Sequence, residues 1–267
     1  MPKVPVAAGS AGKSYYKYYE MGIDALTPEQ LSFVARCRRD REQALEARDR
    51  HLLLTDPNHA PEQTGFYPLK DGGLLVAGNI PLPGVTPDML WWWWAWHGLD
   101  PLRYAIWDCE DHFDVQLNEE GRRRALDPGV PMQEKTWGAV HTVQESIGGP
   151  PDEIVIMFQN PSEMGYDWSK TGTPQCRFLI AANALMGTMK VPVIMTETAS
   201  DSGDGLLFHA RFWVGYHVVD GEAKYLLPPD VKLPEEIAMG LVGHNIKEFS
   251  NLAKILPSVY AEEKDHW

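Results

Sequence analysis

The sequence predicts an α+β fold, with an antiparallel sheet curved around one long helix near the C-terminus. Strand-like segments follow one another through most of the chain with little helix between them, which favours antiparallel pairing. The chain then closes with a helical pattern from about Pro234 to Leu256. Its 267 residues are enough for one large domain, or for a domain with an extension.

Two parts are expected, an N-terminal arm and helix at 1–70 and the main domain at 71–267. Residues 1–26 lack a regular pattern. Their aromatic stretch at 14–21 is expected to pack on another surface, such as a second subunit of a homodimer. Residues 55–70 have the polar, proline-containing composition of a linker.

Two helices have clear start signals. Thr27 and Gln30 form a capping box around Pro28, which predicts a helix that runs to about residue 49. Thr86 followed by Pro87 predicts a short helix over the tryptophan-rich segment, ending near Gly98.

The other segments complete a helix-grip plan, as in Bet v 1-like and START-like domains, where the sheet and the terminal helix enclose a cavity. That analogy concerns the fold and implies no function by itself. The strands are predicted at 74–80, 103–108, 137–146, 153–159, 176–182, 191–198 and 206–219, with a polar excursion at 118–135 and a loop at 160–175.

Composition narrows the class of protein. The formal net charge of −13 argues against a nucleic-acid partner, which normally needs a basic face. No apolar run is long enough to span a membrane, and the first residues lack the apolar core of a signal peptide. Three widely spaced cysteines favour a reduced, cytoplasmic protein, in which histidines and carboxylates would have to hold any metal.

Tryptophan is concentrated in one place. Five of the 10 tryptophans lie between Trp91 and Trp96, and another is Trp107. Successive residues of a helix differ by about 100°, so these indoles cannot all face one way. We therefore expect some of them to pack in the core and others to form the wall of a ligand cavity.

The C-terminal helix carries a polar pair on an apolar stripe. His244 and Glu248 are four residues apart and share a face with the apolar residues Ile237, Leu241, Leu252 and Ile255. A glutamate that faces a core must be paired or must bind a metal. Either Glu248 meets a buried arginine or reaches water, or the pair binds a metal ion. The opposite, solvent-like side holds Glu236, Lys247, Ser250 and Lys254.

Further histidines and acids could complete a metal site. His112 follows the segment WDCED, and His209 and His217 lie in the last predicted strand, on the face shared with Arg211. His141 and Glu145 share one face of a strand about 13 Å apart, so only one of them could join a given ion.

Four segments in this order resemble the 2,4-diacetylphloroglucinol hydrolase and phloretin hydrolase family: LRYAIWDCEDH, HTVQESIG, FHARFWVGY and GHNIKEF. The resemblance covers roughly residues 72–256. It implies a Bet v 1-like domain behind a small N-terminal segment. It also implies a zinc-dependent enzyme that hydrolyses the carbon–carbon bond between an acyl group and a phenolic ring, with a small phenolic ketone as substrate.

The resemblance also implies roles for individual residues. One Zn2+ per chain would be held by His112, Glu145, His244 and Glu248, with His141 and Glu153 as competitors for the place of Glu145. His209 would be a catalytic residue, and Tyr104 would contact the substrate and take part in catalysis. The other substrate-binding candidates are Trp107, Arg211 and Trp213.

This chain departs from the family at two positions that bear on the substrate. Relatives carry a tyrosine near the position of Gly98 and an asparagine near that of Val115, and this chain has neither, so its substrate can differ. Iron, manganese or nickel accept similar ligands. A non-catalytic helix-grip carrier of hydrophobic ligands, or a metal-free polyketide cyclase, would need the cavity without a converging histidine and glutamate set.

Overall fold

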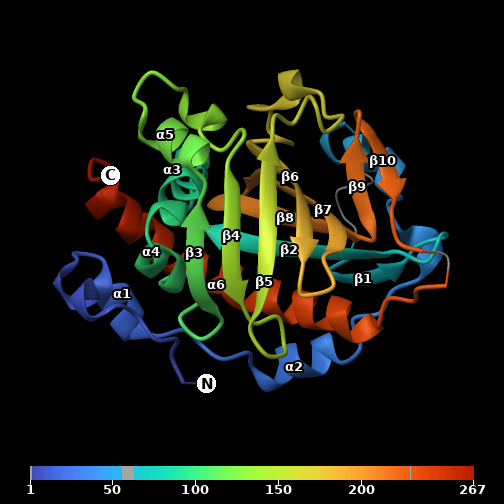
Figure 1. The fold of residues 1–267 in the computed structure, drawn as a ribbon, viewed down its shortest axis with the longest axis horizontal. Coiled ribbons are helices and arrows are strands. Elements are labelled where there is room, and N and C mark those ends of the chain that lie inside the picture. Colours follow the sequence, from blue (N-terminus) through green and yellow to red (C-terminus); the bar gives the residue numbers. More distant parts are fainter. Residues whose placement is uncertain (1, 56–62, 229) are drawn as a thin grey trace.

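The molecule is built on one eight-stranded sheet in which all neighbouring strands are antiparallel. A computed structural model describes residues 2–55, 63–228 and 230–267. The strand order is β1-β2-β8-β7-β6-β5-β4-β3 (Figure 1). The strands are β1 (Gly65–Pro68), β2 (Leu74–Pro83), β3 (His112–Leu117), β4 (Val140–Glu145), β5 (Asp152–Gln159), β6 (Phe178–Met186), β7 (Val191–Ser202) and β8 (Gly205–Val214). A separate hairpin pairs β9 (Tyr216–Val219) with β10 (Glu222–Tyr225).

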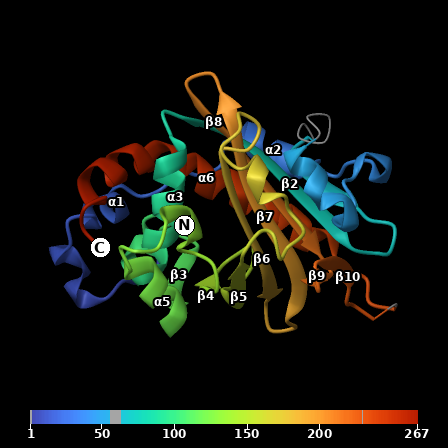
Figure 2. The same cartoon turned by 90° about the horizontal axis from the view of Figure 1, so that it is seen from above.

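One long helix, α6 (Glu235–Glu263), lies across one face of this sheet and packs most extensively on β2. Figure 2 shows the sheet curving around it, with the shorter helices α3 and α5 at the β3 end. The α+β helix-grip prediction is therefore confirmed. The shorter helices are α1 (Tyr16–Met21), α2 (Pro28–Val34), α3 (Pro87–Trp96), α4 (Pro101–Ala105) and α5 (Glu119–Leu126).

The inner face of the sheet and the part of its outer face formed by β1, β2 and β6–β8 are covered, so the molecule has two hydrophobic cores. The inner core lies between the sheet and α3, α4 and α6, and it includes Phe208 and Phe249. The outer core lies between the other face of the sheet and residues 45–54, and it includes Trp213. Alternate residues of one central strand therefore enter different cores.

The predicted helix at 28–49 is much shorter than expected. The capping box at Thr27 forms, but α2 ends at Val34, and Arg38 then makes a parallel bridge to Phe66. The later turns would carry a dense run of charges and little apolar surface, so packing does not support their helix. Residues 56–62 of the predicted linker lie outside the described residues, and β1 occupies its end.

The strand predicted at 103–108 is wrong, because this segment begins as helix α4. The Asp100 side chain accepts from the Leu102 amide, and Pro101 takes the first helical position. These local start signals outweigh the strand preference of Tyr104, Ile106 and Trp107. The polar excursion after it contains α5, which Asn118 caps. The last predicted strand divides into β8 and β9 at Gly215, where φ is 103°.

The aromatic arm packs on its own chain. Tyr15 meets Trp96 with ring centroids 5.2 Å apart, and Tyr18 donates a hydrogen bond to Glu262 of α6. Both tyrosines are buried, so the arm covers this chain's own helix and no longer argues for a second subunit. The boundary at residue 70 stays a prediction, although β1 before it belongs to the main sheet.

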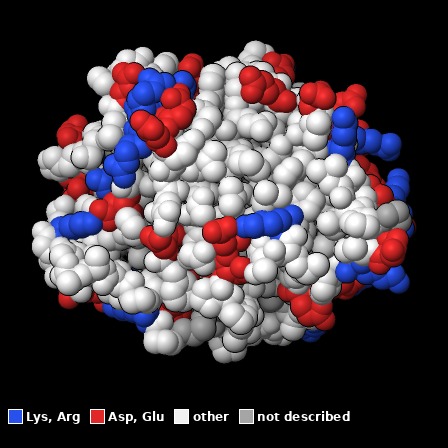
Figure 3. Space-filling view, viewed as in Figure 1, with Lys and Arg blue, Asp and Glu red and all other residues white. Residues whose placement is uncertain are grey.

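Charges of both signs are interspersed on the face drawn in Figure 3. Within the described part of the chain, no helix has both the length and the apolar character needed to cross a membrane.

Candidate metal centre

The tryptophans of this segment point in two directions, some into the core and others toward a cavity. On α3, Trp92 and Trp96 stack with ring centroids 4.6 Å apart, toward the arm and α6. Trp94 and Trp107 instead line a cavity, and among the described residues their ring nitrogens have no hydrogen-bond partner. The expectation that this segment is partly core and partly cavity wall is confirmed.

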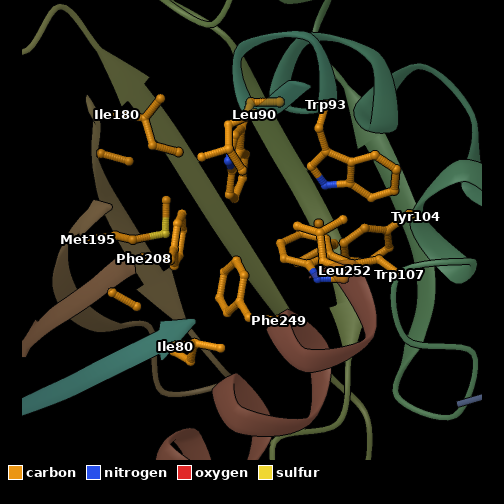
Figure 4. Packing of buried hydrophobic residues seen from close by; sticks show 14 of the residues in the cluster. Ile80, Leu90, Trp93, Tyr104, Trp107, Ile180, Met195, Phe208, Phe249 and Leu252 are labelled. Carbon is orange, nitrogen blue, oxygen red and sulfur yellow. The ribbon is translucent and has the colours of Figure 1, made fainter. Parts of the chain in front are cut away.

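The cavity lies between the inner face of the sheet, α6 and the segment that follows α3. The centre of a water molecule can reach about 70 Å³ inside it. In Figure 4, Tyr104 and Trp107 lie on the helical side, and Ile180 and Met195 lie on the strands. Its lining is largely apolar, with a few polar groups that include Tyr104, Glu145, Glu197, His244 and Glu248. This combination is typical of a small-molecule site.

Four polar side chains meet at one wall of this cavity, and we refer to His112, Glu145, His244 and Glu248 as the His/Glu cluster. His112 Nε2 lies 3.4 Å from His244 Nε2, 3.6 Å from Glu145 Oε2 and 3.5 Å from Glu248 Oε2. His244 Nε2 lies 4.0 Å from Glu145 Oε2 and 3.7 Å from Glu248 Oε2. Ligands about 2.0–2.2 Å from a tetrahedral zinc ion lie roughly 3.3–3.6 Å apart, so this spacing is close to that of a metal site.

Two local features bring the His/Glu cluster together. His112 and Glu145 are direct cross-strand partners at the end of the β3–β4 pair, where an irregularity in register follows His112. His244 and Glu248 lie one turn apart on α6. The strand pair and the helix then meet across the cavity wall.

The electrostatics of the His/Glu cluster favour a bound cation. Burial raises the pKa of Glu145, and burial with the charges of Glu145 and Glu197 raises that of Glu248 well above its ordinary value. Burial, together with the charge of His244, lowers the pKa of His112 well below its ordinary value. A divalent cation would compensate both carboxylates and bind neutral imidazoles, so these residues fit a metal ion.

Tyr104 supports the His/Glu cluster from the side of α4. Its hydroxyl donates a hydrogen bond to Glu145, and its ring stacks on the His112 ring at 4.1 Å with an interplanar angle of 6°. His112 Nδ1 also lies 3.3 Å from the Tyr104 carbonyl oxygen. A histidine that donates from Nδ1 keeps Nε2 free as a ligand.

A buried ion-pair network lies next to His244. Lys247 was expected on the solvent side of α6, but it is buried, with Nζ 3.1 Å from Asp108, 3.0 Å from Glu110 and 2.7 Å from Asp111. Among the described residues, Asp108 Oδ2 and His244 Nδ1 have no hydrogen-bond partner. Ligand atoms of Asp108, Asp111 and His244 lie within 4.8 Å of one another. A carboxylate that accepted a hydrogen bond from Nδ1 would orient the imidazole, but among the described residues neither Asp108 nor Asp111 makes that bond to His244.

His141 and Glu153, the competitors for the place of Glu145, lie outside the His/Glu cluster. His141 lines the cavity but faces His97, with ring centroids 5.3 Å apart, and Glu153 pairs with Lys190 at the surface. His141 also explains why a larger side chain is absent at residue 98. A Cβ added to Gly98 would lie 2.6 Å from the His141 ring.

Three candidates from the last strand are not brought to the cavity. His209, Arg211 and Trp213 lie on the outer face of β8, because alternate residues such as Phe208 and Phe212 face inward. The His209 ring nitrogens are 3.0 Å from Ser200 Oγ and 2.9 Å from Asn79 Oδ1, and the Trp213 ring nitrogen donates to the Leu45 carbonyl. A substrate in this cavity would therefore not contact these three side chains, contrary to the roles that the resemblance implied.

Sequence reasoning missed one polar residue of the cavity, Glu197 on β7. Its strand alternates, and Glu197 shares the inward face with Val193 and Met195. A glutamate at an apolar position of this alternation was the available signal.

The fold and the cavity define a helix-grip protein whose buried His/Glu cluster is suited to a divalent cation in a site for a small ligand. The chain belongs to the family described as the DAPG hydrolase PhiG domain, whose model matches residues 45–261.

Curated relatives agree with this assignment. Phloretin hydrolase of Eubacterium ramulus is 37% identical over 98% of this chain and 95% of its own length. The 2,4-diacetylphloroglucinol hydrolase of Pseudomonas protegens is 26% identical over 78% of this chain and 71% of its own length. The crystal structure of Ara h 8.0201 aligns with 73% of this chain and 99% of its own, at 9% identity and a TM-score of 0.41.

Proposed function

We propose that this protein hydrolyses the carbon–carbon bond between an acyl group and a phenolic ring, releasing a carboxylic acid, with one zinc ion held by the His/Glu cluster. The observation that carries the proposal is the convergence of His112, Glu145, His244 and Glu248 at the wall of an apolar cavity. The names of two relatives, phloretin hydrolase and 2,4-diacetylphloroglucinol hydrolase, support the substrate class of aryl ketones.

A bound zinc ion would polarise the acyl carbonyl or lower the pKa of a water molecule. In the reaction, water supplies a hydroxyl to the acyl carbon, the bond to the ring breaks, and the ring carbon takes a proton. The chain itself provides the surroundings. Trp94 and Trp107 give an apolar wall that limits water. Tyr104 holds Glu145 in place and borders the same space.

A non-catalytic carrier or a metal-free polyketide cyclase would use the same cavity. Neither accounts for two carboxylates and two imidazoles buried together, because such a group is unfavourable unless a cation or another partner compensates it. We infer a cytoplasmic location from the three cysteines, which are buried and unpaired.

We expect the purified protein to contain about one equivalent of divalent metal per chain, and chelation to abolish release of carboxylic acid from aryl ketones. Metal analysis measures the first, and chromatographic detection of the acid measures the second. Re-addition of Zn2+, Mn2+, Fe2+ or Ni2+ to the chelated protein identifies the metal that restores turnover. Less than about half an equivalent of metal, together with turnover that resists chelation, would sink the zinc assignment.

A further inference from the structure

Glu197 is a buried acid on a central strand of the sheet. It lies on β7, is 2% exposed and lines the same cavity as the His/Glu cluster. Its Oε2 has no hydrogen-bond partner among the described residues. The other two carboxylates that line the cavity, Glu145 and Glu248, lie in the His/Glu cluster, where histidine nitrogens and the Tyr104 hydroxyl surround them.

The neighbours of Glu197 within the sheet are apolar, and the charge of Glu197 also acts on Glu248 of the His/Glu cluster. The register places it beside Ala210 of β8 and Ile180 of β6, and Met195 and Ala199 flank it along β7. A buried carboxyl in such surroundings destabilises the folded chain unless a ligand or water pairs with it. The residue therefore points to a polar group that enters the cavity from outside.

The surroundings also define the chemistry of that group. Burial raises the pKa of Glu197 well above its ordinary value and so favours its protonated form, which can donate as well as accept. Trp94 and Trp107, which line the same cavity, offer large apolar faces. A flat ring with hydroxyl substituents complements these features, because its faces are apolar and its edge can both donate and accept.

We propose that Glu197 is a substrate-binding residue whose carboxyl group hydrogen-bonds a hydroxyl on the phenolic ring. This inference deepens the proposed function and rests on it for the substrate class. With the ring held at β7, the acyl group is directed toward the His/Glu cluster, whose Glu145, His244 and Glu248 line the same cavity. The preference for hydroxylated rings then comes largely from one side chain.

Two near-isosteric rings test this contact without turnover. The probes are 1,3,5-trihydroxybenzene and 1,3,5-trimethylbenzene, and the symmetric ring presents a substituent to Glu197 in every orientation. Quenching of tryptophan fluorescence in the purified full chain reports binding. We expect Glu197→Leu to reduce the preference for the hydroxylated ring by roughly three- to tenfold, and Glu197→Gln, which keeps a donor and an acceptor, to retain most of it. Glu222→Leu, at an exposed position of β10, is the control for a lost glutamate.

Thermal unfolding gives a second readout. Because Glu197→Leu removes an unpaired buried acid and leaves an apolar residue of similar size, we expect its Tm to rise by roughly 2–8 °C. A fall in Tm would mean that Glu197 stabilises the fold, and an unchanged ring preference in this variant would overturn the proposed contact.

The outcomes separate the two proposals. If the wild type hydrolyses aryl ketones but Glu197→Leu keeps the ring preference, the contact is wrong and the proposed function stands. If no aryl ketone is hydrolysed but the ring preference depends on Glu197, the contact stands and the proposed function fails.

Discussion

Replacing His244 or Glu248 by alanine is expected to remove the bound metal and to lower kcat/KM by about 10³-fold or more. Each replacement removes one of the four proposed ligand groups. His244→Ala leaves both Glu145 and Glu248 in the cluster, and Glu248→Ala leaves Glu145. Loss of the cation then removes several kcal/mol of stabilisation of the developing charge, and each 1.36 kcal/mol corresponds to about tenfold in rate. Metal analysis and steady-state kinetics on the same samples measure both effects.

Lys254→Ala is the matched control for these variants. Lys254 lies on the exposed side of the same helix, where its partner Asp24 has an 85% exposed side chain. Its replacement shortens a side chain on α6 without touching the cavity, so metal content and kcat/KM should stay at the wild-type level. If His244→Ala and Glu248→Ala both keep metal and turnover, the pair on α6 is structural.

Replacing Lys247 by methionine is expected to destabilise the fold by about 3–5 kcal/mol, the range for breaking a buried ion pair. The side chain is 7% exposed and faces three carboxylates. Burial alone would lower the pKa of Lys247, but the hydrogen bond to Asp111 and the charge of Asp108 outweigh it and raise that pKa. Methionine fills a similar volume and leaves the acids without their cation. Urea denaturation followed by circular dichroism gives the free energy of unfolding.

The same change at the exposed Lys254 shows how much of the destabilisation comes from burial of the ion pair and how much from loss of a positive charge. Lys254→Met breaks a pair at the surface, where such pairs contribute about 0–1 kcal/mol. The double variant Lys247→Met with Asp111→Asn should recover part of the loss, because it removes one of the uncompensated carboxylates. Equal effects of methionine at residues 247 and 254 would show that the three acids do not depend on Lys247.

Local sequence patterns predicted the structure correctly where the feature lies within one helix. The four-residue spacing of His244 and Glu248 on an apolar stripe identified a polar pair facing the core, and both side chains are buried. The capping residues Thr27 and Thr86 located two helix starts, and both side-chain caps form. These features depend on geometry within a few turns, which the order of residues alone determines.

Local patterns did not predict which side chains face the cavity where a strand is buried on both faces. On β8, His209 and Trp213 alternate with Phe208 and Phe212, and period-two alternation separates two faces without saying which one lies inward. Residues 45–54 cover the outer face with a second core, so both sets are buried and polarity gives no direction. Lys247 was placed in solvent for a related reason, since the acids that surround it come from a segment more than 130 residues earlier.

The sequence by itself determined the α+β class, the long terminal helix, the tryptophan wall and the polar pair on that helix, because these follow from periodicity, caps and composition. The resemblance of four short segments added His112 and Glu145. Only the tertiary structure decided that β3 and β4 pair His112 with Glu145 beside α6, that His209 lies outside the cavity, and that Glu197 lies within it. Register and the facing of a sheet depend on contacts between distant segments, which no local pattern contains.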